Sequence, residues 1–190
     1  MLIPTRSFRA PWSSTIHLPK SPLPPRPVIP SPYLAKCADE LYAWQSRRTD
    51  RETFVLHDGP PYANGGLHLG HALNKILKDI ICRFQVSQGK RVQYVPGWDC
   101  HGLPIEVKAL QALKKNHESL SPVAIREAAK KLAEQTIEEQ KAGFKNWAVM
   151  GDWDNAYTTI DPAFELNQLQ IFRNMVKRGT IAPRYVVDSF

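Results

Sequence analysis

The spacing of apolar and polar residues predicts a strand, a long helix and a second strand in the middle of the chain. The segment 53–57, TFVLH, is typical of a short buried strand, and 91–97, RVQYVPG, is a second strand that ends in a proline–glycine turn. Between them, apolar residues recur at helical spacing until Gly89 closes the helix. The apolar positions of this helix are Leu69, Leu73, Ile76, Leu77, Ile80, Ile81 and Phe84. Its opposite side carries Lys75, Lys78, Asp79 and Arg83.

A strand, a long helix and a strand form a βαβ unit, which predicts a parallel sheet and an α/β fold. Ligands of such folds bind at the carboxyl ends of the strands. The loops 58–67 and 97–104 follow the two predicted strands. We therefore expect these loops to face the same crevice.

Further helices are predicted on both sides of this unit. The segment 33–48 has one apolar face, made of Leu34, Cys37, Leu41 and Trp44. A Ser-Pro pair opens a helix over 121–149, and an Asp-Pro pair followed by Glu165 opens the last helix, over 161–179. The sequence GDWDNAYTTID between these helices predicts a turn and a short strand.

Residues 1–32 differ in composition from the rest of the chain. They contain no acidic residue, carry arginines among serines and apolar residues, and hold nine of the sixteen prolines. Five of the 25 basic residues lie within 1–38, so the other 20 basic and 18 acidic residues give only +2 of the net charge of +7. This composition predicts a mitochondrial transit peptide, and a disordered tail is the alternative. We expect ordered structure from about Tyr33 onwards.

Two simple features limit the class of protein. No apolar run approaches the roughly 18 residues of a membrane span, so we expect no membrane association. The three cysteines, Cys37, Cys82 and Cys100, are odd in number and far apart, which predicts free thiols rather than a disulfide framework.

Two histidines stand at the start of the long predicted helix, in the sequence GPPYANGGLHLGH. Unpaired backbone N–H groups at a helix start favour an anion, and His68 and His71 lie on the same side, which suggests a phosphate site. Gly70 between them leaves room for a flat group such as a purine against the backbone. A zinc site lacks further ligands at suitable spacing. A pair of structural histidines remains the alternative.

The second loop, PGWDCHGLPIE, places Asp99 at the end of the second strand without a cationic neighbour in the local sequence. A carboxylate in this place is suited to hold the ammonium group of a substrate. The alternative is a turn-forming aspartate that accepts a hydrogen bond from its own local backbone. Cys100 and His101 receive no catalytic role. The tryptophans Trp98, Trp147 and Trp153 are expected in the core.

Together these loops resemble the class I aminoacyl-tRNA synthetases, and among them the isoleucine-specific group. GPPYANGGLHLGH is similar to the family's His-Ile-Gly-His motif, with Leu69 in the variable place, and YVPGWDCHGLPIE and GDWDNAYTTID are similar to the isoleucyl forms. The resemblance covers residues 33 to about 179. It implies that 33–190 is the N-terminal portion of a Rossmann-like aminoacylation domain.

The resemblance implies a reaction and the residues that serve it. Isoleucine would attack the α-phosphate of Mg²⁺-bound ATP to form isoleucyl-adenylate, and the acyl group would pass to tRNA(Ile). The residues implied in ATP binding are Asn64, His68, Gly70 and His71, of which the two histidines would be catalytic. The residues implied in amino-acid binding are Gly59, Pro60 and Asp99. The resemblance implies no zinc in this segment, a monomer, and, with the leader, the mitochondrial matrix rather than the cytoplasm.

The chain departs from the family after residue 179. The motif Lys-Met-Ser-Lys-Ser, the editing domain and the anticodon-binding domain are absent from the sequence, and a strand predicted at 185–187 has no sheet to join. We expect a fragment or truncated product that carries the first half of an active site. A non-catalytic product that binds nucleotide or a partner is one alternative. A small nucleotidyltransferase that adenylates a carboxylate without tRNA is another.

Overall fold

The structure is a computed structural model that describes residues 31, 33–113 and 120–183. The predicted leader, apart from Ser31, and the strand predicted at 185–187 lie outside the described residues.

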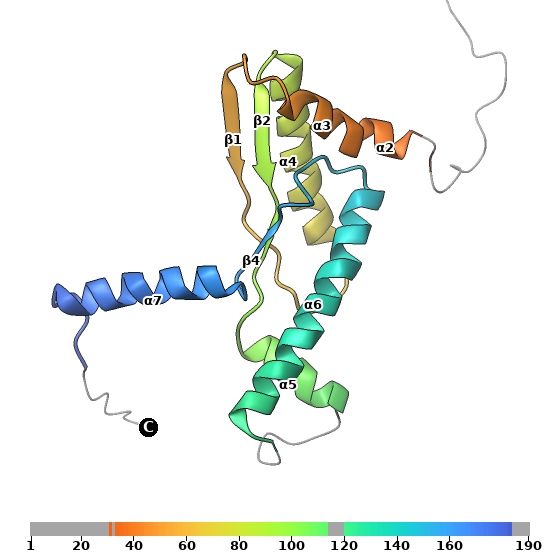
Figure 1. Cartoon of the computed structure of the whole chain (residues 1–190). Helices are drawn as coiled ribbons and strands as arrows, with labels where there is room; N and C mark the ends of the chain where they lie inside the picture. The colour runs from red at the N-terminus through yellow and green to blue at the C-terminus, as the bar shows by residue number, and fades with distance from the viewer. Residues whose placement is uncertain (1–30, 32, 114–119, 184–190) are drawn as a thin grey trace, which may run out of the picture. The chain divides into compact units, whose positions relative to one another are not determined.

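The predicted βαβ unit is present and its strands are parallel (Figure 1). Strand β1 spans Thr53–His57, helix α4 spans Leu69–Ser87 and strand β2 spans Arg91–Val95. The register pairs Thr53 with Arg91 and His57 with Val95, so both strands end at the same level. The prediction that β1 is buried was wrong, because its burial alternates and the side chain of Val55 is 63% exposed.

Two short helices, α2 (Leu34–Cys37) and α3 (Asp39–Ser46), replace the single helix predicted over 33–48. The predicted apolar face was also wrong, because Trp44 is exposed and α3 buries Tyr42 and Gln45 instead. The Gln45 amide donates to the carbonyl of Val92 at 2.8 Å and accepts from its N–H at 2.6 Å. The side chain of Gln45 therefore pairs with β2 as a neighbouring strand would.

A second parallel pair continues from the end of β2. Strand β3 (Gly97–Trp98) pairs with β4 (Tyr157–Thr158), which confirms the short strand predicted after the long helix. The ring of Tyr157 lies so close to Gly97 that a Cβ there would approach it to 2.2 Å. Only glycine fits at this position.

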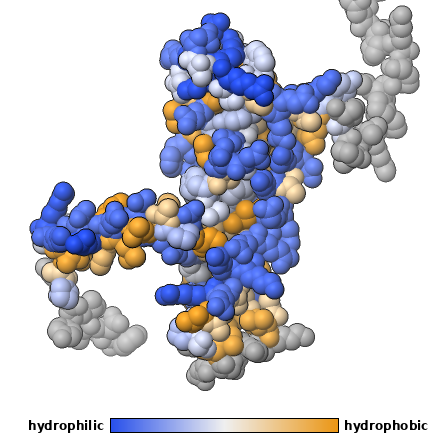
Figure 2. Space-filling view, viewed as in Figure 1, coloured by the Kyte–Doolittle hydropathy of each residue, from blue (hydrophilic) through white to orange (hydrophobic). Residues whose placement is uncertain are grey.

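Three helices complete the described part of the chain. Helix α6 (Pro122–Asn146) is capped by Ser121, and α7 (Pro162–Lys177) is capped by Asp161, which confirms both predicted helix starts. Every residue of α7 is exposed, and Figure 2 shows apolar surface along it. Helix α5 (Leu103–Leu113) packs against α6 and was not predicted, although a proline in its first turn and the i, i+4 spacing of Ile105 and Ala109 were visible in the sequence.

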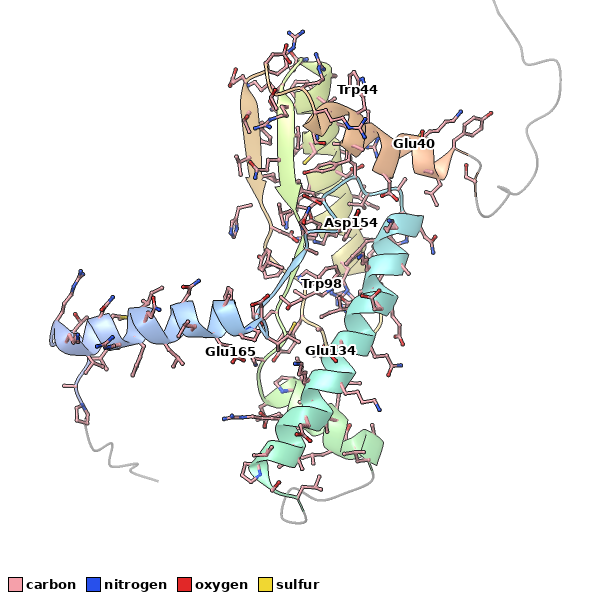
Figure 3. All side chains as sticks on the ribbon, in the orientation of Figure 1. Glu40, Trp44, Trp98, Glu134, Asp154 and Glu165 are labelled. Carbon is pink, nitrogen blue, oxygen red and sulfur yellow. The ribbon has the colours of Figure 1, made fainter. Side chains whose placement is uncertain are left out.

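The core is rich in aromatic residues where the strands meet α6. Figure 3 shows Trp98 in this position, and its ring lies 6.5 Å from that of Phe144 and 6.2 Å from that of Trp153. Trp98 and Trp153 are buried and Trp147 packs against the same cluster, so the prediction for the three tryptophans is confirmed. All three cysteines are free, as predicted.

Helix α4 buries its polar side. Lys75, Asp79 and Cys82 are its buried residues, whereas the apolar positions from Leu69 to Phe84 are between 41% and 84% exposed. Amphipathic helices ordinarily bury the apolar stripe. The buried polar groups of α4 have hydrogen-bond partners. For example, the Asp79 carboxylate accepts from the Met150 N–H at 2.8 Å and from Arg83 Nε at 2.6 Å.

Candidate active site

Two imidazole rings cap the first turn of α4. His68 is the N-cap residue, and its Nδ1 accepts from the N–H of Gly70 at 3.1 Å. The N–H of His68 in turn donates to Nδ1 of His71 at 3.3 Å, which closes a reciprocal capping arrangement. The ring centroids lie 3.9 Å apart. The histidines are thus brought together at the helix start, and each has a structural role there.

The capping bonds select one tautomer of both histidines. An Nδ1 atom that accepts a hydrogen bond carries no proton, so in the neutral ring the proton lies on Nε2. Burial lowers the pKa of His71, and the neighbouring His68 and Lys75 lower it further. The sequence suggested two imidazole donors for a phosphate, and in the structure only Nε2 of each ring is free of the capping bonds.

The space beside Gly70 is filled by the neighbouring cap. A Cβ at this position would lie 2.9 Å from Cε1 of His68. A side chain at residue 70 would therefore displace the imidazole from the cap. This gives glycine a structural reason here, and the His68 ring occupies the side of Gly70 on which the sequence suggested room for a purine.

The loops after β1 and β2 are bonded to each other. Tyr62 and Asp99 form an isolated parallel bridge, in which the N–H of Asp99 donates to the carbonyl of Pro61 at 2.9 Å and the N–H of Ala63 donates to the carbonyl of Asp99 at 2.8 Å. The hydroxyl of Tyr62 also donates to the carbonyl of His101. The two loops therefore meet at the carboxyl ends of the strands, and that they face a common crevice stays a prediction.

The carboxylate of Asp99 is half-buried and makes one weak local contact. Its Oδ1 accepts from the N–H of His101 at 3.4 Å, which is the turn-type bond of the alternative interpretation. Among the described residues no ion pair involves Asp99. The weak contact leaves acceptor capacity on both carboxylate oxygens.

The remaining predicted residues lie along the first loop. Gly59 is exposed and Pro60 half-buried, and the carbonyl of Gly59 accepts from Lys78 Nζ at 3.5 Å. The backbone carbonyl of Asn64 accepts from the Lys108 ammonium, which anchors this part of the loop to α5.

Sequence reasoning missed Gln140, a buried residue of α6 that ties both loops together. Its Nε2 donates to the carbonyls of Tyr62 at 3.2 Å and Gly65 at 2.7 Å, and its Oε1 accepts from the indole N–H of Trp98 at 3.0 Å. A glutamine on a long charged helix gives no sign of such a role in the sequence, because its partners lie between 42 and 78 residues away.

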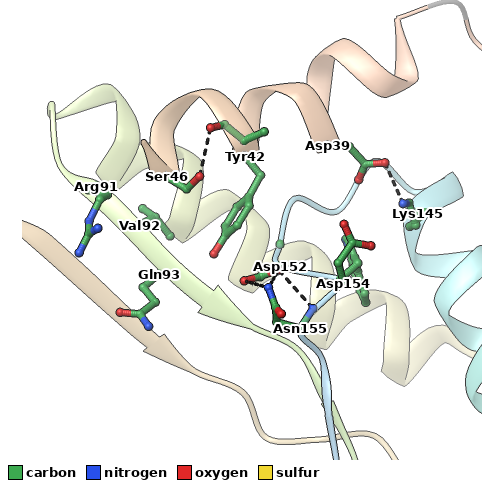
Figure 4. A pocket seen from close by; sticks show the side chains of 13 residues that line it. Asp39, Tyr42, Ser46, Arg91, Val92, Gln93, Lys145, Asp152, Asp154 and Asn155 are labelled. Carbon is green, nitrogen blue, oxygen red and sulfur yellow. Dashed lines mark hydrogen bonds and ion pairs between the residues drawn. The ribbon is translucent and has the colours of Figure 1, made fainter. Parts of the chain in front are cut away.

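The hollow shown in Figure 4 is separate from these loops. It has a volume of about 490 Å³ and is lined by α3, β2 and the turn after α6, with Tyr42, Asp152 and Asn155 among its residues. None of the predicted site residues lines it. Within the described ranges no group of three or more His, Cys, Asp or Glu residues is placed to hold a metal ion, and no helix is long and apolar enough to cross a membrane.

A parallel βαβ unit with paired loops at its strand ends and a histidine-capped helix start is the architecture expected of a class I synthetase catalytic domain. The chain matches the family model described as tRNA synthetases class I (I, L, M and V) over residues 36–187. It belongs to this family, which confirms the resemblance and the predicted fold class.

Several relatives with similar sequences are isoleucine–tRNA ligases. The mitochondrial enzyme of Gallus gallus is 58% identical over 146 residues, and that of Mus musculus is 53% identical over 151 residues. These matches cover 77% and 79% of this chain and 14% and 15% of the relatives. The enzyme of Cyanothece sp. is 48% identical over 175 residues, covering 90% of this chain and 18% of the relative. The chain thus spans about a sixth of the length of these relatives.

A solved structure with a similar fold supports the family assignment. The crystal structure of the ternary complex of Agrobacterium radiobacter K84 agnB2 LeuRS-tRNA-LeuAMS is similar with a TM-score of 0.57 at 25% identity. The similarity covers 70% of this chain and 16% of that one.

Proposed function

We propose that this chain carries the first half of the active site of an isoleucine–tRNA ligase. The observation that supports this most directly is the contact between the two loops: the bridge between Tyr62 and Asp99 joins the loop that leads into the helix capped by His68 and His71 to the loop that carries Asp99. The relatives that match over this same segment are isoleucine–tRNA ligases.

In this proposal the residues bind and orient the reactants. His68 and His71 donate through Nε2 to the phosphate oxygens of ATP, and Mg²⁺ enters with the phosphates as part of the substrate. Asp99 holds the α-ammonium of isoleucine, and the backbone of Gly59 and Pro60 borders the amino acid. Gly70 and Asn64 lie on the ATP side. Catalysis then consists of positioning and charge stabilisation as the carboxylate attacks the α-phosphate.

The location proposed for the protein is the mitochondrial matrix. The acid-free, arginine-bearing leader supports this location, and so do the mitochondrial relatives of Gallus gallus and Mus musculus. Transfer of the isoleucyl group to tRNA(Ile) requires the longer protein, and we propose it for that protein as a monomer.

The test is a graft of residues 36–183 into the mouse mitochondrial enzyme in place of the matching segment, with isoleucine-dependent ATP–pyrophosphate exchange as the readout. We expect exchange with isoleucine, a loss of at least tenfold for His71→Ala, and a raised isoleucine KM with unchanged ATP KM for Asp99→Ala. Lys90→Met is the control, because its pair with Glu52 lies where β1 and β2 begin, at the other end of the strands from the two loops. An inactive wild-type graft contradicts the ligase function of this segment.

The 190-residue chain is measured separately for nucleotide binding by equilibrium dialysis with labelled ATP. If the 190-residue chain binds ATP but the graft shows no ATP–pyrophosphate exchange, the alternative of a non-catalytic nucleotide-binding product is favoured. Exchange that persists when tRNA charging is lost would favour a small nucleotidyltransferase.

A further inference from the structure

A buried cluster of charged residues lies directly behind the two loops and takes no part in the proposed chemistry. Asp58 follows the last residue of β1, and its side chain is fully buried. Its Oδ2 lies 2.5 Å from Nζ of Lys75, and its Oδ1 lies 2.7 Å from Nζ of Lys78. One carboxylate therefore accepts from two ammonium groups that lie on the polar side of α4.

The same carboxylate reaches the second loop. The N–H of Gly97 donates to Oδ2 of Asp58 at 3.2 Å, and Gly97 stands two residues before Asp99. The hydroxyl of Tyr157 lies 3.4 Å from the backbone carbonyl of Asp58. Asp58 thus joins the end of β1, the middle of α4 and the start of β3, which are three segments far apart in the sequence.

The cluster touches the first loop on its amino-acid side. Lys78 Nζ bonds to Asp58 and also lies 3.5 Å from the carbonyl of Gly59. The ammonium of Lys75 has a further partner in the Tyr94 hydroxyl at 3.0 Å, so this buried charge is satisfied on two sides. In contrast, the bonds that hold His68 and His71 are local to the first turn of α4.

We propose that Asp58, held by Lys75 and Lys78, is a positioning residue that fixes the amino-acid half of the site by setting Gly59 and the Gly97–Asp99 strand relative to each other. Removing the carboxylate frees Gly97 and leaves two ammonium groups without their partner. Such a change loosens Asp99 and Gly59 together, whereas the histidine cap keeps its own bonds. The positioning role in catalysis rests on the proposed function, and the structural role does not.

The first test uses the full 190-residue chain without ligand and measures amide hydrogen exchange by NMR. In Asp58→Asn we expect the amides of Gly97, Asp99 and Ala63 to exchange at least tenfold faster relative to the interior amides of α6. Equal acceleration at all amides, or no change at the loops, overturns the proposal. Lys78→Met removes the Oδ1 contact of a partly exposed side chain and leaves Lys75 and Gly97 on Oδ2, so it gives a weaker form of the same test if Asp58→Asn does not fold.

The second test uses the graft in the mouse enzyme and separates the two substrates. We expect Asp58→Asn to raise the isoleucine KM at least tenfold while the ATP KM stays within threefold, and Asp58→Glu to recover part of the loss. A parallel rise of both KM values, or a fall in kcat alone, overturns a role confined to the amino-acid half.

The control is Lys145→Met, because the Lys145–Asp39 pair at 2.8 Å also joins a helix to a segment distant in the sequence, but it is partly exposed and involves neither loop. This substitution should leave the amide hydrogen exchange of the loops and both KM values unchanged. If the wild-type graft is inactive, the proposed function fails. Amide hydrogen exchange in the ligand-free chain still tests whether Asp58 holds the two loops in place.

Discussion

The two sides of helix α4 are reversed with respect to the rule for amphipathic helices. The side that carries Lys75 and Asp79 is buried and fully bonded, whereas the apolar stripe that includes Leu73 and Ile80 is exposed in the described residues. Burying charges is unfavourable unless each finds a partner of opposite sign and good geometry. The buried side meets this condition: no buried polar side-chain atom in the described part of the chain lacks a partner.

The two sides of α4 contribute differently to the fold and its stability. Along α4 the buried charges specify which segments meet, since Asp58, Met150 and Tyr94 come from three other parts of the chain. The apolar stripe has no such partners in the described ranges and so contributes little to the stability of this chain. Substitutions on the two sides are therefore expected to differ by several kcal/mol.

Among substitutions that remove a single contact of α4, the largest effect is expected for Lys75→Met. The substitution keeps the length of the side chain and leaves the buried Asp58 carboxylate with Lys78 as its one ammonium partner. Breaking a buried pair by removing one partner costs about 3–5 kcal/mol. Urea unfolding of the 190-residue chain measures this loss. Lys130→Met, which removes an exposed pair on α6, is the control and should change stability by less than about 1 kcal/mol. Equal effects of the two substitutions would contradict the comparison.

The stretch of sequence around α4 shows what could be predicted and what could not. The parallel unit, the meeting of the two loops and the caps Ser121 and Asp161 follow from local spacing and from the rule that parallel strands end at one edge. Periodicity reveals that a helix has two unlike sides but does not reveal which neighbour each side meets. The burial of Lys75 depends on Asp58, 17 residues away, and on Tyr94, 19 residues away.

For the candidate site too, the positions of residues in helices and strands were predictable but their contacts were not. His68 and His71 were placed at a helix start and Asp99 at a strand end because such ends are recognisable in sequence, and their roles in binding stay predictions. Their capping bonds were not identified, because a histidine ring can accept from the backbone or donate to a ligand and the sequence is the same in both cases. Gln140 was missed because its three partners are set only by the tertiary fold.

A second prediction concerns acid. Burial alone would raise the pKa of Asp58, but the ammonium groups of Lys75 and Lys78 outweigh it and hold the pKa below its usual range. A carboxyl group with a lowered pKa in the folded state stabilises the protein above its unfolded pKa of about 3.9, and this stabilisation is lost as the pH falls through the folded value. The stability gap between the wild-type chain and Asp58→Asn should therefore be full at pH 7 and shrink below about pH 4. Unfolding curves at several pH values measure the gap, and a gap that stays constant down to pH 2 would contradict the assignment.

A third, smaller effect is expected at the helix start. In Gly70→Ala the new Cβ meets the His68 ring, so the imidazole must leave the cap. Loss of an N-cap costs about 0.5–2 kcal/mol. Because alanine also favours helix by up to about 1 kcal/mol over glycine, the net change is expected near the lower end of that range. Leu73→Ala, an exposed position of the same helix, is the control. The displaced cap is identified if the NMR signals of the His68 ring shift in Gly70→Ala and stay unchanged in Leu73→Ala. A more stable Gly70→Ala protein would show that His68 moves without cost.

The smallest effect is expected on the exposed apolar side of α4, where Ile80→Glu places a charge in the middle of the stripe. Ile80 is 56% exposed, so the substitution neither opens a cavity nor buries a charge, and surface changes of this kind stay within about 0.5 kcal/mol. The matched substitution on the other side, Cys82→Glu, buries a carboxylate at a position with no exposure and should prevent folding. Circular dichroism with urea titration measures both. A loss of more than about 2 kcal/mol for Ile80→Glu would mean that the apolar stripe is packed in the chain as it exists, and the reversal of the two sides of α4 would then be wrong.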